Sequence, residues 1–172
     1  MSDTPTLTGP GVVLRPLVLA DAPAIFIALS DPDVQLYRRD AAHAAVGETR
    51  RYIADTLARS RAAWAVTEDG GEALGRLALR TPEPDVGEFG IVIRRAAQRR
   101  GLGLKALALA EAHAFDDLGL ARLVADVDAE NGASLALFRR AGFVDERLMP
   151  AYRTTKLGLR DSIILAKARA GR

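Results

Sequence analysis

Hydrophobic residues recur along the chain with two alternating spacings, one typical of strands and the other of helices. Runs with strand character are expected at Val12–Leu17, Ala63–Thr67, Glu72–Leu79, Gly87–Ile93, Arg122–Asp128, Phe143–Leu148 and Ser162–Ala168. Amphipathic stretches with helical spacing are expected at Ala22–Leu29, from about Gly47 to Ser60, at Leu102–Leu118 and at Asn131–Ala141. This succession predicts an α/β domain with a mixed sheet.

Turn-forming residues separate these segments. Asp21 is a good N-cap for the first helix, and Asp31-Pro32 ends that helix because the residue before a proline avoids helical backbone angles. The Asp69-Gly70-Gly71 sequence predicts a hairpin. Gly119 and Gly142 are expected to end the last two helices.

Two of the expected strands, Gly87–Ile93 and Arg122–Asp128, are separated by the long helix at Leu102–Leu118. A strand, a helix and a second strand form a crossover connection, so these two strands are expected to be parallel. The sequence has no internal repeat and no linker long enough to divide it. We therefore expect one domain over residues 1–172, with a core from about 12 to 168.

The composition removes several kinds of chemistry. The 172 residues include no Cys and only two His, His43 and His113. A chain without Cys has no disulfide, no thiolate nucleophile, no iron–sulfur cluster and no Cys-based zinc site. Two His do not make a multi-histidine site, so no metal cofactor is expected.

The positive charge is nearly all arginine. There are 24 Lys+Arg against 22 Asp+Glu, and Lys105, Lys156 and Lys167 are the only lysines. A net charge of +2 is too small to favour nucleic acid as a partner. A local cluster is more informative, and within twelve residues it contains Arg94, Arg95, Arg99, Arg100 and Lys105.

The sequence carries no visible targeting segment. Met1–Gly11 is polar and rich in Pro and Gly, without the basic and apolar regions of a secretory signal. No stretch approaches the roughly 20 apolar residues of a membrane helix. These features predict a cytoplasmic protein without membrane partners. The expected oligomeric state is a monomer or a homodimer.

A glycine turn joins the Gly87–Ile93 strand to the long helix. Its sequence is Gln98-Arg99-Arg100-Gly101-Leu102-Gly103. Glycines let backbone N–H groups face a ligand, and the helix adds about half a positive charge at its N-terminus. With Arg99 and Arg100, these features favour a phosphate or pyrophosphate site, and a solvated basic turn is the structural alternative.

Two other phosphate motifs fit less well. The sequence has no G-x4-G-K-S/T loop. Gly101-Leu-Gly103-Leu-Lys-Ala106 matches the G-x-G-x-x-A dinucleotide fingerprint, and Asp126 lies at a suitable distance downstream. However, Arg94 to Arg100 separate the strand from the glycines, and the 71 residues after Gly101 are too few for the rest of a dinucleotide fold.

The same turn resembles the Q/R-x-x-G-x-G/A signature of the GNAT superfamily of acetyl-CoA-dependent N-acetyltransferases. Val13-Leu14-Arg15-Pro16-Leu17, followed by Asp21-Ala22, is similar to the opening of its RimJ/RimL-type branch. Asn131-Gly-Ala-Ser134, then Phe138 and Ala141-Gly142-Phe143, is similar to the N-x-x-S…G-F segment of that branch. The resemblance covers about residues 12 to 168. It implies a mixed, mostly antiparallel sheet of about six to seven strands, flanked by helices and splayed at residues 87–93.

The resemblance also implies acetyl-CoA as co-substrate. In the family the basic turn holds the CoA pyrophosphate, the preceding strand offers backbone groups to the pantetheine arm, and Asn131 would hydrogen-bond that arm. The implied cofactor-binding positions are Ile91, Val92, Ile93, Gln98, Arg99, Arg100, Gly101, Leu102, Gly103, Leu104, Asn131, Ser134 and Phe138.

Two polar side chains are candidates for proton transfer. Glu88 is a lone carboxylate in an apolar strand, and apolar surroundings disfavour the charged form of a carboxyl group, which makes it a stronger base. The alternative is an outward-facing strand residue. Many family members use a Tyr as acid where this chain has Phe138, so Ser134 is the expected acid, as the RimL-type branch also suggests. Otherwise Ser134 is a first-turn serine bonded to backbone. A backbone N–H within Ile91–Ile93 is the expected oxyanion donor.

The resemblance implies direct attack by a primary amine in a ternary complex, because a chain without Cys forms no acyl-cysteine intermediate. The acceptor is a protein N-terminus or a small-molecule amine, and an amino sugar, aminoglycoside or polyamine is less favoured. The segment Tyr37–Ala45 with His43, and Tyr152 and Arg153 between the last two strands, are candidates to line its site. The acidic grouping near these loops is Asp31, Asp33 and Asp40. A non-catalytic acyl-CoA-binding or regulatory module remains the alternative class.

Overall fold

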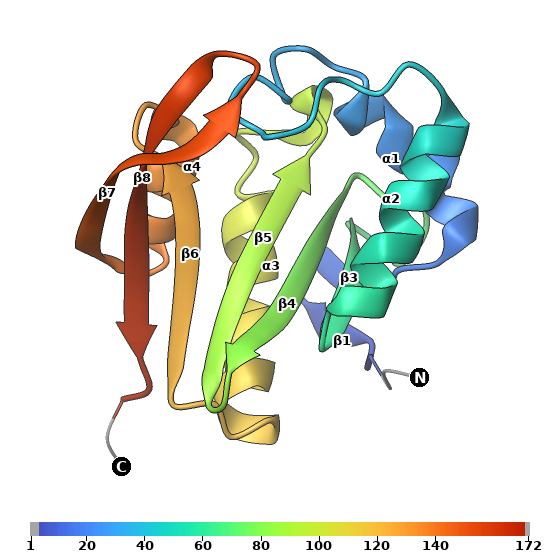
Figure 1. Ribbon diagram of the computed structural model, residues 1–172. Helices are drawn as coiled ribbons and strands as arrows, with labels where there is room; N and C mark the ends of the chain where they lie inside the picture. Colours follow the sequence, from blue (N-terminus) through green and yellow to red (C-terminus); the bar gives the residue numbers. More distant parts are fainter. Residues whose placement is uncertain (1–3, 171–172) are drawn as a thin grey trace.

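Eight strands form one sheet in the computed structural model of the chain, which describes residues 4–170 (Figure 1). The strands, in sheet order, are β1 (Leu7–Gly9), β2 (Val12–Pro16), β3 (Ala62–Thr67), β4 (Gly75–Glu83), β5 (Val86–Ile93), β6 (Arg122–Asp128), β8 (Gly158–Ala168) and β7 (Val144–Thr155). The α-helices in the described residues are α1 (Ala22–Leu29), α2 (Val46–Arg59), α3 (Leu102–Ala112) and α4 (Gly132–Arg140). None of these described helices is long and apolar enough to cross a membrane.

The pairing of β5 with β6 is parallel, and the other neighbouring strands are antiparallel. In the described chain, β5 and β6 pair at three positions, which are Val86↔Arg122, Gly87↔Leu123 and Glu88↔Val124. Beyond Glu88, β5 continues along β4 and β6 continues along β8. The two strands therefore diverge, as Figure 1 shows. This confirms the predicted parallel pair and the predicted splay.

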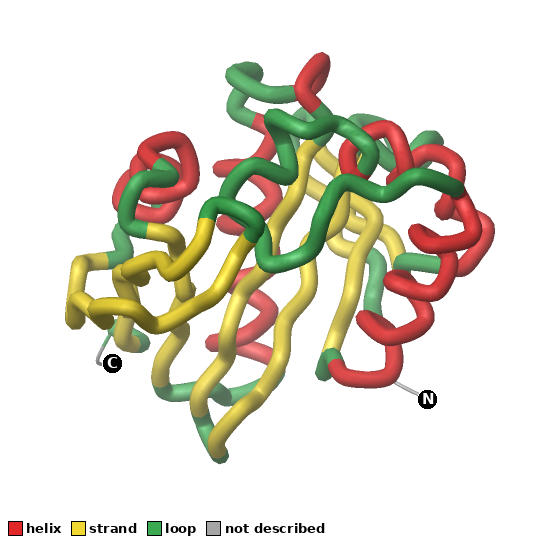
Figure 2. Tube along the Cα trace, turned by 45° about the horizontal axis from the view of Figure 1, so that its top comes forward, coloured by secondary structure: helices red, strands yellow, loops and turns green. Residues whose placement is uncertain are grey.

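Helices cover both faces of the sheet. α3 and α4 lie on one face, and α1 and α2 lie on the other (Figures 1 and 2). The larger core cluster joins α3 and α4 to the sheet through buried residues such as Trp64, Leu107 and Phe138. The smaller cluster joins α1 and α2 to the opposite face through Ile25 and Ile53. The diverging strands β5 and β6 thus lie between two independently packed layers.

The sheet has more strands than the six to seven expected. The additional strand, β1, is three residues long and pairs antiparallel with β2. A strand of this length shows no alternation of apolar and polar residues, so the hydrophobic pattern did not reveal it. It lies within Met1–Gly11, of which residues 1–3 are outside the described residues.

The last two strands are longer than predicted. They were expected at Phe143–Leu148 and Ser162–Ala168, but β7 runs to Thr155 and β8 begins at Gly158. Because β7 is an edge strand with mostly exposed residues, it lacks the alternation that burial on one face imposes. Tyr152 and Arg153 consequently lie inside β7, which corrects their expected position between the strands.

The bounds of β4 and of the long helix also differ from the prediction. β4 begins at Gly75 instead of Glu72 and extends to Glu83, past Pro82. The proline is accommodated because the β4–β5 register shifts between Arg80 and Glu83, and bulges tolerate a missing N–H donor. The long helix ends as regular α-helix at Ala112 and continues as a π-helical turn over His113–Asp117.

A glycine allows β4 to approach the open part of β5 closely. Gly75 pairs with Ile93, and a Cβ atom at Gly75 would lie 2.2 Å from the backbone oxygen of Val92. Backbone atoms of a central strand move only if the sheet moves. The position of β5 at the end that leads into the glycine turn therefore depends on the absence of a side chain at Gly75.

Substitution of Gly75 by alanine should destabilise the fold. The added methyl group overlaps backbone, so we expect a loss of roughly 1–3 kcal/mol in the free energy of unfolding. The matched control is Gly47→Ala in α2, where a Cβ meets no atom within 4 Å and helix propensity predicts a gain of up to about 1 kcal/mol. Urea denaturation of both variants measures the difference, and equal stabilities would contradict the proposed packing.

Candidate active site

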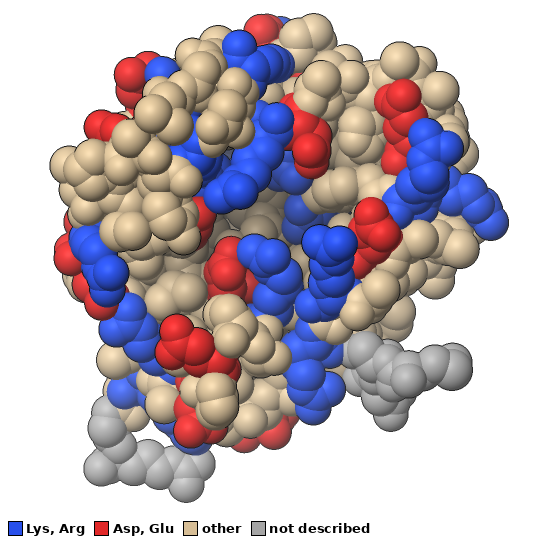
Figure 3. Space-filling model, viewed as in Figure 1, with Lys and Arg blue, Asp and Glu red and all other residues tan. Residues whose placement is uncertain are grey.

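A cavity of about 720 Å³ opens where β5 and β6 separate. Its wall includes residues from both faces of the sheet, because side chains of β5 and β6 point alternately to either side. Glu88 and Asp126 contribute from the face covered by α1 and α2, while Ser134 and Phe138 contribute from α4 on the other face. Figure 3 shows the hollow near the middle of the molecular surface, bordered by basic and acidic side chains. The cavity thus passes through the sheet.

Glu88 lies at the base of this opening. It is the last residue of β5 paired with β6, and it stands opposite Arg80 of β4. Oε1 of Glu88 accepts a hydrogen bond of 2.5 Å from the Arg80 guanidinium, and 22% of the Glu88 side chain is exposed. The prediction that Glu88 has apolar surroundings is therefore wrong. The carboxylate faces the cavity beside a positive charge that the sequence pattern did not place there.

Ser134 and Asn131 lie together at the start of α4. Asn131 is the N-cap, and its Oδ1 accepts the backbone N–H of Ser134 at 3.2 Å. The amide nitrogen of Asn131 is left to donate to a ligand. The Ser134 hydroxyl makes no hydrogen bond with residues 4–170, and both residues line the cavity. Phe138, one turn later, is buried against Phe143 with a ring-centroid distance of 5.2 Å.

The glycine turn begins α3 with a left-handed residue. Gly101 is the N-cap with φ +76°, and among the described residues no side chain caps the helix. The first N–H groups of a helix lack intrahelical acceptors, so this end can bind an anion. Arg99 has φ +60° and is exposed, and it makes no ion pair with any described residue. Gln98 instead donates from Nε2 to the Ile93 carbonyl at 2.8 Å, which ties the turn to β5.

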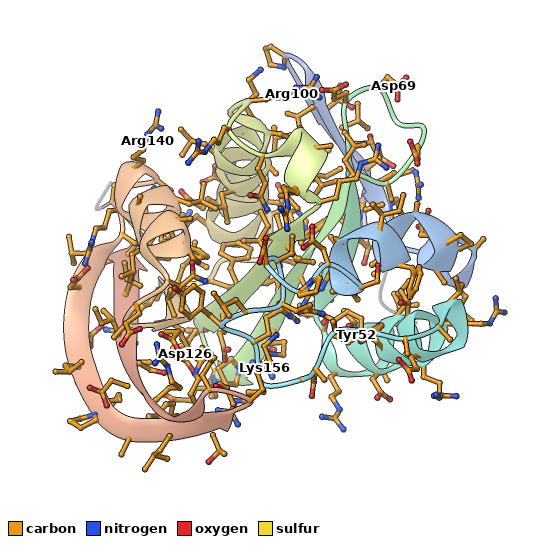
Figure 4. All side chains as sticks on the ribbon, turned by 90° about the horizontal axis from the view of Figure 1, so that it is seen from above. Tyr52, Asp69, Arg100, Asp126, Arg140 and Lys156 are labelled. Atoms are coloured by element: carbon orange, nitrogen blue, oxygen red, sulfur yellow. The ribbon has the colours of Figure 1, made fainter. Side chains whose placement is uncertain are left out.

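The other arginines of this cluster already have partners. Arg94 pairs with Glu72 at 3.0 Å, Arg95 pairs with Asp31 at 2.6 Å, and Arg100 pairs with Glu68. Within residues 4–170, the basic cluster therefore divides into three arginines that hold loops together and two exposed cations without an ion pair, Arg99 at the turn and Lys105 on α3. In Figure 4, Arg100 and Asp69 lie at the same end of the molecule.

The turn is connected to the cavity, although its residues do not line it. A Cβ at Gly103 would lie 3.4 Å from the Leu137 side chain of α4 and 3.8 Å from that of Ile91. Ile91 is on the cavity wall, whereas Val92 and Ile93 are buried. Leu102 is buried and Leu104 is half-buried on α3. Apart from the buried Val92 and Ile93, the expected cofactor positions thus form two neighbouring groups, one on the cavity wall and one at the helix start.

A tyrosine between two arginines forms the opposite wall. Tyr52 of α2 accepts hydrogen bonds at its hydroxyl from Nε of Arg76 at 2.8 Å and from Arg38 at 2.9 Å. Burial would raise the pKa of Tyr52, but the two positive charges and their hydrogen bonds outweigh it and hold the pKa below its ordinary value of 10.0. Figure 4 shows Tyr52 and Asp126 at two sides of the same central space.

Ion pairs order the part of the wall formed by β6, β7 and β8. Arg153 of β7 contacts Asp126 and donates from Nε to the Ser162 hydroxyl at 2.9 Å. Arg160 bonds both carboxylate oxygens of Asp128 at 3.0 Å. Burial would raise the pKa of Asp128, but the hydrogen bonds from Arg160 and from the backbone outweigh it, so this pKa lies below its usual range.

The loops expected near the acceptor are only partly on the wall. Tyr152, Arg153 and residues 37–40 line the cavity, but His43 does not. His43 contacts the Thr49 hydroxyl at 2.8 Å, and burial lowers its pKa. Asp31 and Asp33 pair with Arg95 outside the cavity wall, so the expected acidic grouping at the acceptor site is wrong except for Asp40.

Sequence reasoning did not assign four polar residues of the cavity wall to the site. They are Arg76 and Arg80 of β4, Asp126 of β6 and Tyr52 of α2. A signal was present in β4, because Arg76 and Arg80 interrupt an otherwise apolar segment at even spacing and so share one face of the strand. The position of Tyr52 opposite that face depends on how α2 packs, which the local sequence does not determine.

The comparison with known families identifies the class of protein. A family model described as an acetyltransferase (GNAT) domain matches residues 12–144. The chain belongs to the GNAT acetyltransferase family. No curated protein matches significantly.

Comparison with solved structures shows which members of the family this chain is similar to. RimJ of Mycobacterium smegmatis, solved in complex with CoA-disulfide, is 25% identical with a TM-score of 0.82, over 95% of this chain and 86% of that one. A GNAT acetyltransferase from Bacillus anthracis has 17% identity and a TM-score of 0.87, over 95% and 98% of the two chains. The ribosomal-protein-S5-alanine acetyltransferase from Vibrio fischeri has 16% identity and a TM-score of 0.79, over 95% and 96%. The similarities to the Bacillus and Vibrio proteins show a shared fold. The similarity to RimJ supports the assignment of this chain to the RimJ/RimL-type branch.

Tyr52 should ionise below the ordinary range for tyrosine. A depressed folded-state pKa stabilises the fold above the unfolded pKa, and this stabilisation is lost as pH falls through the folded pKa. The stability advantage of the wild type over Tyr52→Phe should therefore grow as pH rises toward 10. Ultraviolet titration should show a phenol component below pH 10 that Tyr52→Phe removes. A titration unchanged by this substitution would refute the electrostatic account.

Proposed function

We propose that this protein transfers an acetyl group from acetyl-CoA to a primary amine by direct attack in a ternary complex. The observation that carries the proposal is the cavity through the splayed strands, with Glu88 on one face and Ser134 on the other. A cofactor arm that enters from the α3 and α4 face would bring its end to the face where the acceptor cavity opens. Family membership supports the same assignment.

The residues present suit coenzyme A. The uncapped start of α3 and the free Arg99 offer N–H groups and a charge for its pyrophosphate. Beyond Glu88, the edge of β5 toward β6 has no strand partner among residues 4–170, so backbone groups near Ile91 are available to the amides of the pantetheine arm. The amide nitrogen of Asn131 adds a donor on the cavity wall. When bound, acetyl-CoA supplies the acetyl group as an activated thioester.

Side chains of the protein would carry out the proton transfers. Glu88 accepts a proton from the acceptor amine, directly or through a water molecule, while Arg80 holds its carboxylate at the opening. The hydroxyl of Ser134 donates a proton to the departing sulfur, because this hydroxyl faces the cavity without another partner among residues 4–170. A backbone N–H on the open edge of β5 stabilises the developing oxyanion. The thioester sulfur belongs to the co-substrate, since the chain contains no Cys.

The proposed acceptor is a protein N-terminus or a small-molecule amine, and the proposed location is the cytoplasm. The similarity to RimJ favours a protein N-terminus. A polyamine or an aminoglycoside fits less well, because the cavity wall has six arginines against five carboxylates, and three of these carboxylates are paired with arginines: Glu88, Asp126 and Asp128. A polycation would find few free negative charges there.

A non-catalytic acyl-CoA-binding module is the second candidate. The observation that favours it is Phe138, a buried core residue at the position where many relatives carry the acidic tyrosine. Both candidates bind acetyl-CoA, and a ligand at 100 times its dissociation constant stabilises the fold by about 2.7 kcal/mol. Turnover with an amine distinguishes them.

Loss of the proposed base should lower the rate of acetyl transfer. Glu88→Gln keeps the shape but removes the proton acceptor, so we expect kcat to fall roughly 10²–10⁴-fold, and Ser134→Ala should also lower kcat. The matched control is Glu83→Gln, an exposed position outside the cavity wall, which should leave kcat unchanged. Thiol release with peptide amines measures all four proteins. Full activity of both cavity variants would remove the assigned roles, and a wild type that binds acetyl-CoA without turnover would favour the binding module.

A further inference from the structure

The cavity wall holds more positive charge than its carboxylates neutralise. Of the six arginines on the wall, Arg80 pairs with Glu88 and Arg153 pairs with Asp126. The remaining four make no ion pair with any described carboxylate, and they are Arg38, Arg39, Arg59 and Arg76. The cavity therefore offers unmatched positive charge to whatever occupies it.

The acidic residues on the wall do not compensate this charge. Asp128 is committed to Arg160, which bonds both of its oxygens. Asp40 and Asp55 are exposed and form no ion pair with a described residue. These two carboxylates equal in number the exposed arginines Arg39 and Arg59. The unpaired arginines that are not exposed are Arg38 and Arg76, and both donate to the Tyr52 hydroxyl.

Arg76 is buried, and its hydrogen bonds within residues 4–170 are all to uncharged groups. Its guanidinium donates to the Tyr52 hydroxyl and, at 2.9 Å, to the Gly90 carbonyl. It lies 5.2 Å from the centre of the Tyr52 ring. A buried cation without a counter-ion is costly, and ionisation of Tyr52 would neutralise only one of the two neighbouring charges. The site is electrostatically incomplete without an anion.

Arg38 is the member of this group that a ligand can reach. It lies on the loop before α2, and it is half-exposed, whereas Arg76 is buried. One of its guanidinium nitrogens donates to Tyr52 at 2.9 Å, while its Nε is buried without a hydrogen-bond partner. The phenol thus holds the guanidinium in place and leaves donors unused. A carboxylate is the anion that matches such a planar fork.

The position of this group relative to Glu88 limits the acceptor. Arg76 contacts Gly90, which is two residues from Glu88 on the same face of β5, and such positions are about 7 Å apart. Arg38 is linked to Arg76 through the Tyr52 hydroxyl, so a carboxylate bound at Arg38 and an amine at Glu88 would occupy different parts of the cavity wall. An acidic side chain close to a peptide N-terminus can reach such a second position, whereas the α-carboxylate of a free amino acid stays next to its amine.

We propose that Arg38, positioned by Tyr52 and Arg76, binds a carboxylate of the acceptor, so that the preferred substrate is an N-terminus followed closely by an acidic residue. This inference rests on the proposed acetyl transfer and names its substrate class. Arg38 contacts the acceptor, whereas Tyr52 and Arg76 are positioning residues. A small amine that carries a carboxylate presents the same two groups as such a peptide, so it is tested separately.

The test uses peptide pairs that differ only in Glu or Gln at the first or second residue. With the wild-type protein, kcat/KM should be roughly 10–100-fold higher for the Glu peptide, as expected for a charge-assisted hydrogen bond. In Arg38→Gln this ratio should fall to about one, because kcat/KM for the Glu peptide decreases. Arg38→Lys should keep part of the preference, because the charge remains and the planar fork is lost. Tyr52→Phe should raise KM for the Glu peptide with little change in kcat.

Arg140→Gln serves as the matched control, since Arg140 is exposed on α4 away from the cavity wall (Figure 4). Equal rates for Glu and Gln peptides in the wild type would overturn the inference while leaving acetyl transfer intact. A preference for small amino dicarboxylates over both peptides would overturn the peptide assignment. Calorimetric binding of the same peptides separates the two proposals: Arg38-dependent binding of the Glu peptide without turnover would support the subsite and refute the proposed catalysis.

Discussion

The parallel pairing of β5 with β6 stops after three positions, and the rest of the site depends on this. Each strand keeps a full antiparallel partner on its other side, so the divergence leaves the sheet stable. Helices on both faces pack into separate clusters and hold the two halves apart. The result is an unpaired strand edge inside a folded protein, next to a cavity that crosses the sheet.

Charge distinguishes the two ends of this passage. At the end that leads to α3, most arginines of the basic cluster form ion pairs with loop carboxylates. The N–H groups at the start of α3 have no side-chain cap among the described residues, and they can bind a phosphate. At the proposed acceptor end, Tyr52 lies between two guanidinium groups, neither of which forms an ion pair with residues 4–170. The proposed chemistry lies between them at Glu88 and Ser134. The proposed pyrophosphate site and the proposed carboxylate site would thus lie at opposite ends of one passage.

Local sequence predicts the elements that are buried on one face, and it fails where burial gives no pattern. The strand at Arg122–Asp128 and the helix at Ala22–Leu29 have the predicted bounds because their apolar spacing follows the core. The exposed edge strand β7 has no such spacing and was predicted too short. Glu88 and Ser134 were identified as candidates from the sequence and both line the cavity, whereas Tyr52 and Arg76 meet only through the packing of α2 on β4. Contacts between distant segments of this kind leave no local signal.

The central claim is that the open edge of β5 receives the arm of coenzyme A, and amide hydrogen exchange tests it directly. Without ligand, amides on the unpaired edge between Phe89 and Ile93 should exchange faster than those of Val86–Glu88 that face β6. Addition of acetyl-CoA should slow exchange at that open edge and at the start of α3, with no change in β7. Unchanged exchange along β5 at saturating acetyl-CoA would contradict the account.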